Sequence, residues 1–206
     1  QLFMKRLIKK SGQPIRLYYC GEYGPTTRRP HYHACLFGWR PTDPLLFSQG
    51  SDYKLYESPL LTSVWGLGHA TFGELTFDSA AYCARYITEK ITGEPAQDHY
   101  TYIDDETGEC FPISPEFNGM SRRPGIGKPW HERYGTEVGL KDEVIMSGRP
   151  MRPPRAYDRW FEHTDPETWL SIKEERSNKP RIIRTERQLR AASIIAKSRM
   201  IKRSNL

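Results

Sequence analysis

The segment IRLYYCGEYGPTTRRPHYHACLFGW, residues 15–39, decides the fold of this chain. Residues 15–22 and 31–39 are rich in β-branched and aromatic side chains, a composition that favours β-strands. Between them, residues 24–30 (GPTTRRP) contain the glycine and prolines that are typical of a turn. The sequence therefore predicts two antiparallel strands joined by a short loop.

Two imidazoles and one carboxylate fall on this strand pair in a pattern that suits a metal ion. Side chains alternate between the two faces of a strand, so His31 and His33 lie on the same face. Glu22 ends the preceding strand and comes alongside them if the turn closes. Such a site suits Mg²⁺ or Mn²⁺ and can polarise a phosphate. Two alternatives stay open: hydrogen-bonded structural histidines, and a zinc site that includes Cys35 on the same face.

A helix is predicted to begin after Asp78 as its N-cap and to end at Gly93 in a left-handed stop. Tyr82, Tyr86 and Lys90 recur every four residues within it, so they form one stripe. A tyrosine hydroxyl can attack phosphorus, and a lysine can stabilise the developing negative charge. The alternative is a pair of tyrosines packed on the sheet, with the lysine in solvent.

The remaining sequence predicts an α+β fold, in which a central antiparallel sheet has flanking helices. A third strand is expected at residues 70–75, and loops or turns at 41–57 and 94–154. The domain is expected to span residues 1–150, followed by a helical extension with a basic tail at 151–206. Further helices are expected in the opening residues around 3–8 and at 59–65, 157–163 and 166–177.

The basic residues are concentrated at both ends of the chain. Its 206 residues carry a net charge of +6, divided into +6 for residues 1–50, −8 for 51–178 and +8 for 179–206. A segregated basic excess can form a phosphate-binding surface, and contact with DNA or RNA is the favoured interpretation of the tail. The alternative is a solvated, partly disordered basic helix. No apolar run approaches the roughly 20 residues that a membrane helix needs, so membrane proteins are excluded. The four cysteines form no C-x-x-C pair, and reduced thiols are expected.

Several separate segments resemble one family. RPHYHACLFG (29–38) resembles motif 2 of the HUH endonucleases, with Glu22 at the upstream acidic position, and YCARYITEK (82–90) resembles their two-tyrosine motif 3. Together with PEFNGMSRRPGIG (115–127) and the opening QLFMKRL, these segments are similar to the replication-initiation proteins of microviruses, above all the gokushovirus branch. The resemblance covers residues 1–127.

This resemblance implies an endonuclease that nicks one strand of origin DNA, stays attached to the 5′ phosphate through tyrosine and leaves a 3′ hydroxyl for rolling-circle replication. The implied partners are single-stranded or replicative-form origin DNA and the host helicase and polymerase, in the bacterial cytoplasm. Mg²⁺ or Mn²⁺ is the implied cofactor. The catalytic residues would be Tyr82, Tyr86 and Lys90, and the metal ligands Glu22, His31 and His33.

Basic side chains near these motifs are candidate contacts for the DNA backbone. For Arg122, Arg123 and Lys128, the alternative is a surface loop fixed by Pro124 and Pro129. The segment GIGKPW lacks the earlier glycine and the following Ser or Thr of a P-loop, so it predicts no nucleoside triphosphate site. The candidates are Arg28, Arg29, Arg122, Arg123 and Lys128.

The family fold begins with a strand that ends in a Thr-rich pattern, and nothing upstream of Phe3 could supply it. The sheet is therefore expected to lack this N-terminal strand, as in a fragment or a shortened variant. A second hypothesis is a non-catalytic, zinc-stabilised basic protein that binds or packages nucleic acid. Only the enzyme would form a covalent adduct with DNA.

Overall fold

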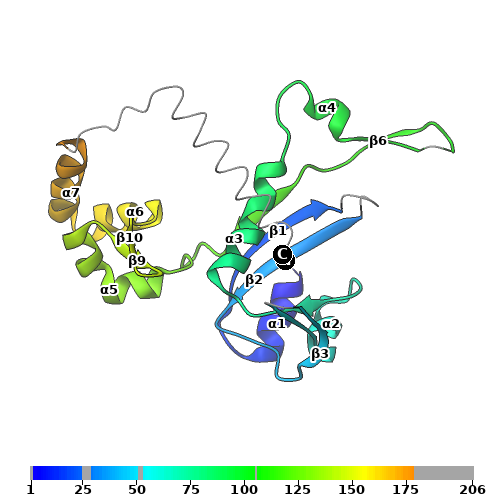
Figure 1. Ribbon diagram of the computed structural model, residues 1–206, viewed down its shortest axis with the longest axis horizontal. Coiled ribbons are helices and arrows are strands. Elements are labelled where there is room, and N and C mark those ends of the chain that lie inside the picture. The colour runs from blue at the N-terminus through cyan, green and yellow to red at the C-terminus, as the bar shows by residue number, and fades with distance from the viewer. Residues whose placement is uncertain (1, 25–28, 51–52, 105, 179–206) are drawn as a thin grey trace. The chain divides into compact units, whose positions relative to one another are not determined.

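The computed structural model describes residues 2–24, 29–50, 53–104 and 106–178, apart from the side chains of Ile87 and Glu89. It divides into two compact units, residues 1–126 and residues 127–206, and each is described by itself (Figure 1). Helices and small antiparallel sheets occur together, so the predicted α+β class is confirmed. The domain boundary predicted at residue 150 stays a prediction. The basic tail at 179–206 lies outside the described residues.

A three-stranded antiparallel sheet forms the centre of the first unit. Its strands are β1 (Arg16–Tyr23), β2 (Pro30–Phe37) and β8 (Phe117–Met120), in the order β2-β1-β8. The predicted pairing of the first two strands is confirmed, and their register runs without a break from Arg16 opposite Phe37 to Tyr23 opposite Pro30.

Two glycines let β8 lie close to β1. A Cβ atom on Gly21 would come within 2.6 Å of the Phe117 ring, and one on Gly119 would come within 2.6 Å of the Tyr19 ring. Each glycine therefore leaves the space that an aromatic ring of the neighbouring strand fills. The pairing brings residues about a hundred positions apart into one sheet.

Two helices cover one face of this sheet. They are α1 (Leu2–Ser11) and α2 (Pro59–Trp65), both at the predicted positions. From β2, Leu36 packs against the core between these helices, and the Tyr32 ring lies 5.5 Å from the Trp65 ring. The buried members of this core are Leu7, Ile15 and Val64.

The opposite face is covered by α3 (Phe77–Arg85) and the 3₁₀-helix η1 (Tyr86–Glu89). The thiol of Cys20 on β1 is buried and donates a hydrogen bond to the carbonyl oxygen of Cys83 on α3, at 3.2 Å. Because side chains alternate along a strand, the residues facing α3 are those that share the face of Cys20 and His33.

A second sheet, in the order β3-β4-β5, replaces part of the predicted loop. The strands β3 (Leu45–Gln49) and β4 (Lys54–Glu57) show that the loop predicted at 41–57 is wrong. All residues of β3 are exposed, so neither face of this strand is buried. The alternation of apolar and polar residues that indicates a half-buried strand is therefore missing from its sequence. The strand predicted at 70–75 is reduced to β5 (Thr71–Phe72), which pairs with β4 and not with the central sheet.

The segment before β8 also contains regular structure where only turns were predicted. It comprises α4 (Ala96–His99) and a hairpin of β6 (Thr101–Ile103) and β7 (Cys110–Pro112). The buried Tyr100 hydroxyl donates to the carboxylate of Glu116 at 2.5 Å and accepts from the backbone N–H of Ile91 at 2.9 Å. These bonds tie the base of the hairpin to the chain that follows η1.

The second unit begins with a helix that the sequence did not predict. This helix, α5 (Lys128–Lys141), contains Pro129 in its first turn and two interior glycines, which disfavour a helix by propensity. Both glycines lie under aromatic rings: a Cβ on Gly139 would meet the Phe161 ring at 2.6 Å. Tertiary packing therefore outweighs propensity at α5. The unit also contains a hairpin of β9 (Val144–Met146) and β10 (Arg149–Met151).

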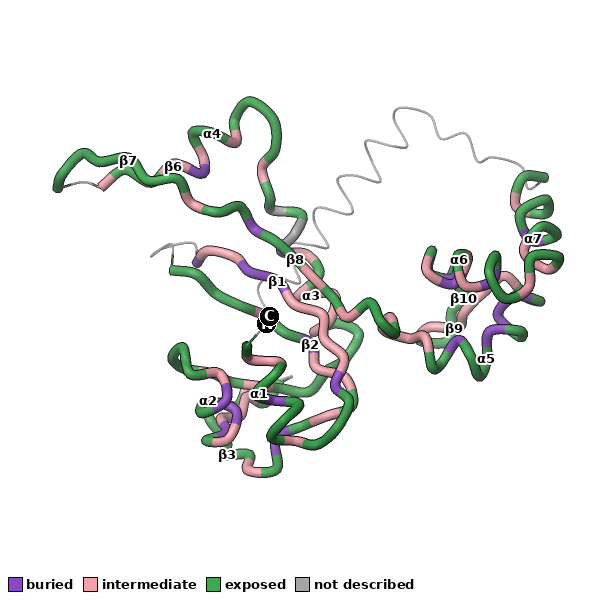
Figure 2. Tube along the Cα trace, turned by 180° about the vertical axis from the view of Figure 1, so that it is seen from behind, coloured by how far each residue is buried: buried purple, intermediate pink, exposed green. Residues whose placement is uncertain are grey.

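The helices α6 (Arg155–Thr164) and α7 (Pro166–Asn178) complete the described part of this unit and confirm the two helices predicted there. Arg176 on α7 holds the unit together, because its guanidinium bonds Asp142 at 2.6 Å and Asp158 at 2.9 Å. Figure 2 shows buried residues of this unit on α5, α6 and α7, and Pro153 before α6 is buried as well. None of the helices within the described ranges combines the length and apolar character needed to cross a membrane.

A buried imidazole makes the second unit sensitive to pH. His131 on α5 is only 5% exposed, lies among the rings of Tyr157, Trp160 and Phe161, and its Nε2 atom has no hydrogen-bond partner in the part of the chain that the structure describes. Burial, with a smaller effect of Lys128, lowers the pKa of His131. The imidazole is therefore held neutral in the folded unit.

We predict that acid destabilises this unit through His131. The unfolded chain protonates His131 at a higher pH than the folded chain, so stability falls as the pH drops below about 6.5. His131→Phe removes this contribution, and thermal melting at about pH 7.5 and about pH 5.5 should then differ less than in the parent chain. The exposed His163 provides the control His163→Phe, which should keep the parent pH dependence. Equal pH dependence in His131→Phe and the parent would contradict the assignment.

Candidate functional site

Glu22 and His33 form the centre of the candidate site on the central sheet. The strand register places Glu22 directly opposite His31, and His33 shares their face two residues further along β2. The Nε2 atom of His33 lies 2.8 Å from Oε1 of Glu22, and both side chains are partly buried. The structure thus brings two of the three predicted ligands into direct contact.

His31 is turned away from this pair. Its Nδ1 atom is 2.8 Å from the carbonyl oxygen of Arg29, and its ring occupies the space beside Gly24, where a Cβ atom would come within 2.7 Å of the imidazole. Consequently, no group of three or more His, Cys, Asp or Glu side chains is arranged around a common point in the described residues.

The donor set nevertheless fits a divalent cation. One carboxylate and two imidazoles on one face of a two-stranded ribbon supply the oxygen and nitrogen ligands that Mg²⁺, Mn²⁺ and Zn²⁺ accept. Coordination by all three requires only that the His31 ring leave the Arg29 carbonyl oxygen, because its backbone position is already opposite Glu22. The assignment of these ligands stays a prediction.

The helix α3 begins and ends at residues other than those predicted. Thr76, not Asp78, is the N-cap, and its hydroxyl and that of Ser79 form a reciprocal capping box. Asp78 lies in the first turn, where a carboxylate favours the helix dipole. The α-helix ends at Arg85 rather than at Gly93, and the chain continues as a 3₁₀-helix.

This change of helix type removes Lys90 from the predicted stripe. A 3₁₀-helix has three residues per turn, and Lys90 lies at the C-cap of η1 with an extended ψ of 120°. The helical spacing predicted for Lys90 is therefore wrong, whereas its catalytic role stays a prediction. The cation nearest to the tyrosines on α3 is Arg85, whose guanidinium carbon lies 5.7 Å from the centre of the Tyr82 ring. Arg85 follows Tyr82 by three residues, a spacing that makes two side chains neighbours on a helix. The sequence-based prediction did not use this spacing.

Both predicted tyrosines converge on His33. The Tyr86 ring stacks on the imidazole, with ring centres 4.5 Å apart, and the Tyr82 ring meets it edge-on at 5.9 Å. The Tyr86 hydroxyl donates a hydrogen bond to the Tyr82 hydroxyl. Tyr82 is 41% exposed and Tyr86 is 9% exposed, so the first phenol is open to solvent and the second is buried against the sheet. Figure 1 shows α3 beside β1 and β2 in the first unit.

Comparison with known proteins identifies relatives of this chain. The family model for replication-associated proteins of the ORF2 type matches residues 1–91. The chain is 31% identical over 179 residues to replication-associated protein VP4 of Bdellovibrio phage phiMH2K, covering 82% of the chain and 53% of the relative. It is 30% identical over 154 residues to replication-associated protein ORF2 of Spiroplasma virus 4, covering 72% and 43% respectively. No solved structure matches.

The chain is related to the microvirus-type replication-associated proteins. A third relative, replication-associated protein ORF4 of Chlamydia phage 1, is 31% identical over 100 residues, covering 44% of the chain and 25% of the relative. The chain spans about half the length of the first curated relative, and less of the other two. The family match includes the whole constellation of Glu22, His33 and the two tyrosines.

The thiols of Cys20, Cys35 and Cys83 lie between the central sheet and α3. Burial raises the pKa of the Cys20 thiol to about 11, with Cys83 and Glu22 adding to the effect. A hydrogen bond with Cys83, together with burial, raises the pKa of the Cys35 thiol. Both thiols are buried where α3 meets the sheet. Cys35 therefore contacts Cys83 on α3, and no zinc cluster that includes it is present among the described residues.

The predicted DNA-binding residues belong to separate segments of the chain. Arg28 lies outside the described residues, while Arg29 is exposed at the start of β2. Arg122 and Arg123 are exposed in the segment that follows β8, and Arg123 offers its carbonyl oxygen to Arg16 at 3.4 Å. Lys128 belongs to the second unit, where its ammonium lies 5.0 Å from the centre of the Trp160 ring. Their contact with DNA stays a prediction.

We predict that the thiols report how α3 packs on the sheet. Cys20 should react with iodoacetamide at least about 100-fold more slowly than the exposed Cys110 at about pH 8, because burial raises its pKa and restricts access. Mass spectrometry of labelled peptides measures both rates, and the denatured chain provides the control in which the difference should disappear. Similar rates in the folded chain would show that α3 does not cover β1.

Proposed function

We propose that this chain cuts one strand of DNA by attack of a tyrosine on a phosphodiester, as the initiating step of replication. The observation that carries this proposal is the contact of the Tyr82 and Tyr86 hydroxyls next to the Glu22–His33 pair. An isolated pair of tyrosines would indicate core packing. Here one phenol is exposed and the other is stacked on an imidazole that a carboxylate orients.

The proposed step transfers a phosphoryl group to the protein. The phenol oxygen forms a bond to phosphorus, and the bond between phosphorus and the 3′ oxygen breaks. The phenol loses its proton and the released 3′ oxygen gains one, which gives the 3′ hydroxyl. The product is a 5′-phosphotyrosine that keeps the energy of the broken bond. In rejoining, a free 3′ hydroxyl would attack the phosphotyrosine, so that the bond between phosphorus and the 3′ oxygen forms, the bond to the phenol oxygen breaks and the proton returns to the phenol. The second tyrosine would make a further cut that supplies such a 3′ hydroxyl.

Tyr82 is the first nucleophile in this arrangement. It is the exposed phenol, so its oxygen is the one that a DNA phosphate can reach, and the hydrogen bond that it accepts from Tyr86 holds this oxygen in place. The Arg85 guanidinium near the Tyr82 ring supplies positive charge on the same helix. Arg85 thus takes the electrostatic role that the sequence suggested for Lys90.

Glu22, His31 and His33 would hold Mg²⁺ or Mn²⁺. The bound ion would polarise the scissile phosphate as a Lewis acid. The hydrogen bond between Glu22 and His33 orients the His33 ring. The Tyr86 ring stacks on this imidazole and is positioned by it. A single imidazole therefore links the ligand set to the tyrosines.

The proposed substrate is single-stranded or melted origin DNA in the bacterial host cytoplasm, and the released 3′ hydroxyl would serve the host polymerase and helicase in rolling-circle synthesis. The relatives support this role, because all three are replication-associated proteins of bacterial phages or of a Spiroplasma virus. The basic excess of residues 1–50 supports a polyanionic substrate.

We predict a covalent adduct that depends on the two tyrosines. A labelled single-stranded origin oligonucleotide incubated with Mn²⁺ should remain on the protein in a denaturing gel. Tyr82→Phe should reduce the first-turnover adduct at least about a thousandfold, because the phenol oxygen is the nucleophile. Tyr86→Phe should retain a larger fraction, and the double variant should form none. The exposed Tyr102 provides the control Tyr102→Phe, which should behave like the parent. DNA binding without any adduct would instead support the non-catalytic hypothesis.

We predict that loss of the His33 side chain reduces adduct formation but leaves the affinity for DNA nearly unchanged. His33→Ala removes both the hydrogen bond to Glu22 and the stacking surface of Tyr86. Adduct formation should fall by at least about a hundredfold, as is usual when a positioned catalytic-site imidazole is lost, while affinity for the oligonucleotide changes by less than about threefold. Fluorescence anisotropy measures the affinity. The control His69→Ala removes an exposed imidazole that pairs with Glu57, and it should retain both properties. Unchanged adduct formation in His33→Ala would contradict the proposed site.

A further inference from the structure

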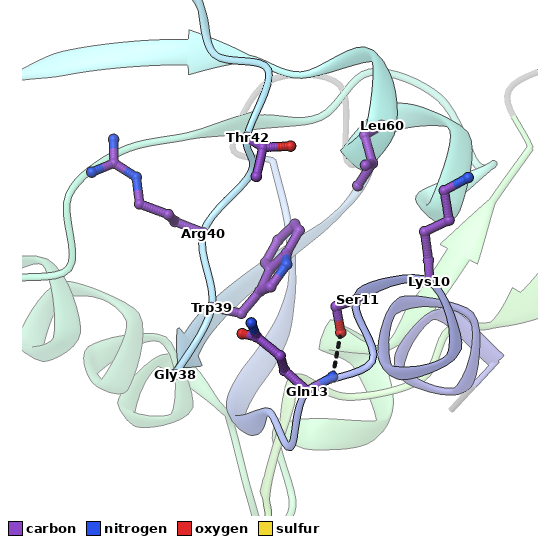
Figure 3. Close-up of a pocket in the computed structure, with 8 residues that line it drawn as sticks. All are labelled: Lys10, Ser11, Gln13, Gly38, Trp39, Arg40, Thr42 and Leu60. Atoms are coloured by element: carbon purple, nitrogen blue, oxygen red, sulfur yellow. Dashed lines mark hydrogen bonds between the residues drawn. The ribbon is translucent and has the colours of Figure 1, made fainter.

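A cavity of about 660 Å³ lies between the end of α1 and the chain that follows β2 (Figure 3). This volume is within the range of small-molecule sites. Trp39 stands in the middle of the lining, and Lys10 and Arg40 lie on opposite sides of it. Gln13 and Thr42 add an amide and a hydroxyl.

The side chains that line this cavity carry a net positive charge. Lys10 and Arg40 form no ion pair within the described ranges, and no acidic side chain lines the cavity. The nearest acid along the chain, Asp43, is engaged elsewhere: its carboxylate accepts hydrogen bonds from the Ser58 hydroxyl and, at 2.8 Å, from the Leu60 N–H. The cavity therefore attracts an anion.

The indole is held in place before any ligand binds. Trp39 packs against the core that contains Leu7 and Val64 while also lining the cavity. Gly38 precedes it with φ of +87°, and a Cβ there would meet the Pro14 carbonyl oxygen at 3.3 Å. The bonds of Asp43 fix the following loop to the start of α2. A ring fixed in this way gives a stacking surface at little entropic cost.

We propose that this cavity binds one unpaired nucleotide of single-stranded DNA. The base stacks on Trp39, the adjacent phosphates bind Lys10 and Arg40, and the Gln13 amide faces the base edge. An aromatic platform flanked by cations is the combination with which proteins hold single strands without reading a long sequence. This inference rests on the proposed function for its substrate class.

The cavity lies within reach of the strand that carries the histidines. Trp39 follows His33 by six residues, so their Cα atoms are at most about 20 Å apart along an extended chain. A stacked strand advances about 3.4 Å per nucleotide. The bound nucleotide should therefore lie within about six nucleotides of the scissile linkage.

We predict that the two cations contribute to single-strand affinity beyond their charge. The measurement uses the full chain with Tyr82→Phe and Tyr86→Phe, so that cleavage does not consume the oligonucleotide. Adding Lys10→Gln and Arg40→Gln should weaken binding about tenfold and reduce the slope of log K against log salt by about 1.4, or 0.7 for each phosphate contact. Duplex DNA of the same sequence should show a smaller loss, because its bases cannot stack on Trp39.

Matched variants provide the control. Lys9→Gln with Lys54→Gln removes the same charge from exposed lysines of the same unit that do not line the cavity. This pair should lose less than about threefold in affinity. Equal losses for both pairs, or an equal loss with duplex DNA, would overturn the proposal.

Photocrosslinking locates the nucleotide. Oligonucleotides carrying 5-iododeoxyuridine at successive positions around the cleavage site should crosslink to Trp39 from one or two adjacent positions only. Trp39→Phe should lose this crosslink, while circular dichroism checks that the variant folds. Crosslinks elsewhere with none to Trp39 would overturn the proposal.

The two proposals fail separately. Crosslinking to Trp39 without a phosphotyrosine adduct in the parent chain would retain the nucleotide site and overturn the nicking activity. Adduct formation combined with cavity variants that bind like their controls would retain the activity and overturn the nucleotide site.

Discussion

The register between β1 and β2 is the constraint on which the rest of the first unit depends. It places Cys20 opposite His33 and Glu22 opposite His31. A shift of β2 by one residue against β1 would move His31 and His33 to the face that packs against α1 and α2, away from Glu22. The buried thiol of Cys20 and the apolar Leu36, which lie on opposite faces, both oppose such a shift. The geometry of the site is thus a consequence of core packing on both sides of the ribbon.

The same packing positions the two tyrosines. The hydrogen bond from Cys20 to the Cys83 carbonyl oxygen holds α3 at the residue between the two tyrosines. The change from α-helix to 3₁₀-helix at Tyr86 then directs this ring onto His33, leaving Tyr82 one turn earlier and open to solvent. Two identical side chains therefore experience different environments. This asymmetry makes an order of use physically reasonable where spacing alone indicates none.

The sequence predicted those elements that short-range patterns of residues determine. The strand pair, α1 and α2 follow from composition, turn residues and apolar spacing, and all three are present. The sequence missed β8, whose pairing with β1 depends on rings filling the space at Gly21 and Gly119. It also missed α5, where aromatic contacts outweigh the low helix propensity of proline and glycine. The candidate site was predicted in its residue types and only partly in its geometry. Alternation along β2 correctly placed His31 and His33 on the face of Glu22, because strand periodicity fixes the face of a side chain. Periodicity does not fix a side-chain rotamer, and His31 turns to the Arg29 carbonyl oxygen. Nor does it reveal where an α-helix tightens, which is why Arg85 rather than Lys90 lies beside Tyr82.

One strand serves both parts of the proposed chemistry. The exposed start of β2 carries the histidines, and the chain beyond its end carries Trp39 and Arg40. Hydrogen bonds to β1 fix β2 along its whole length. Core packing of Trp39 and the bonds of Asp43 hold the chain that follows, so both positions are restrained. A single strand of DNA held at both would be stretched over a fixed length. The rigid sheet would then set which linkage reaches the tyrosines, by distance rather than by reading every base.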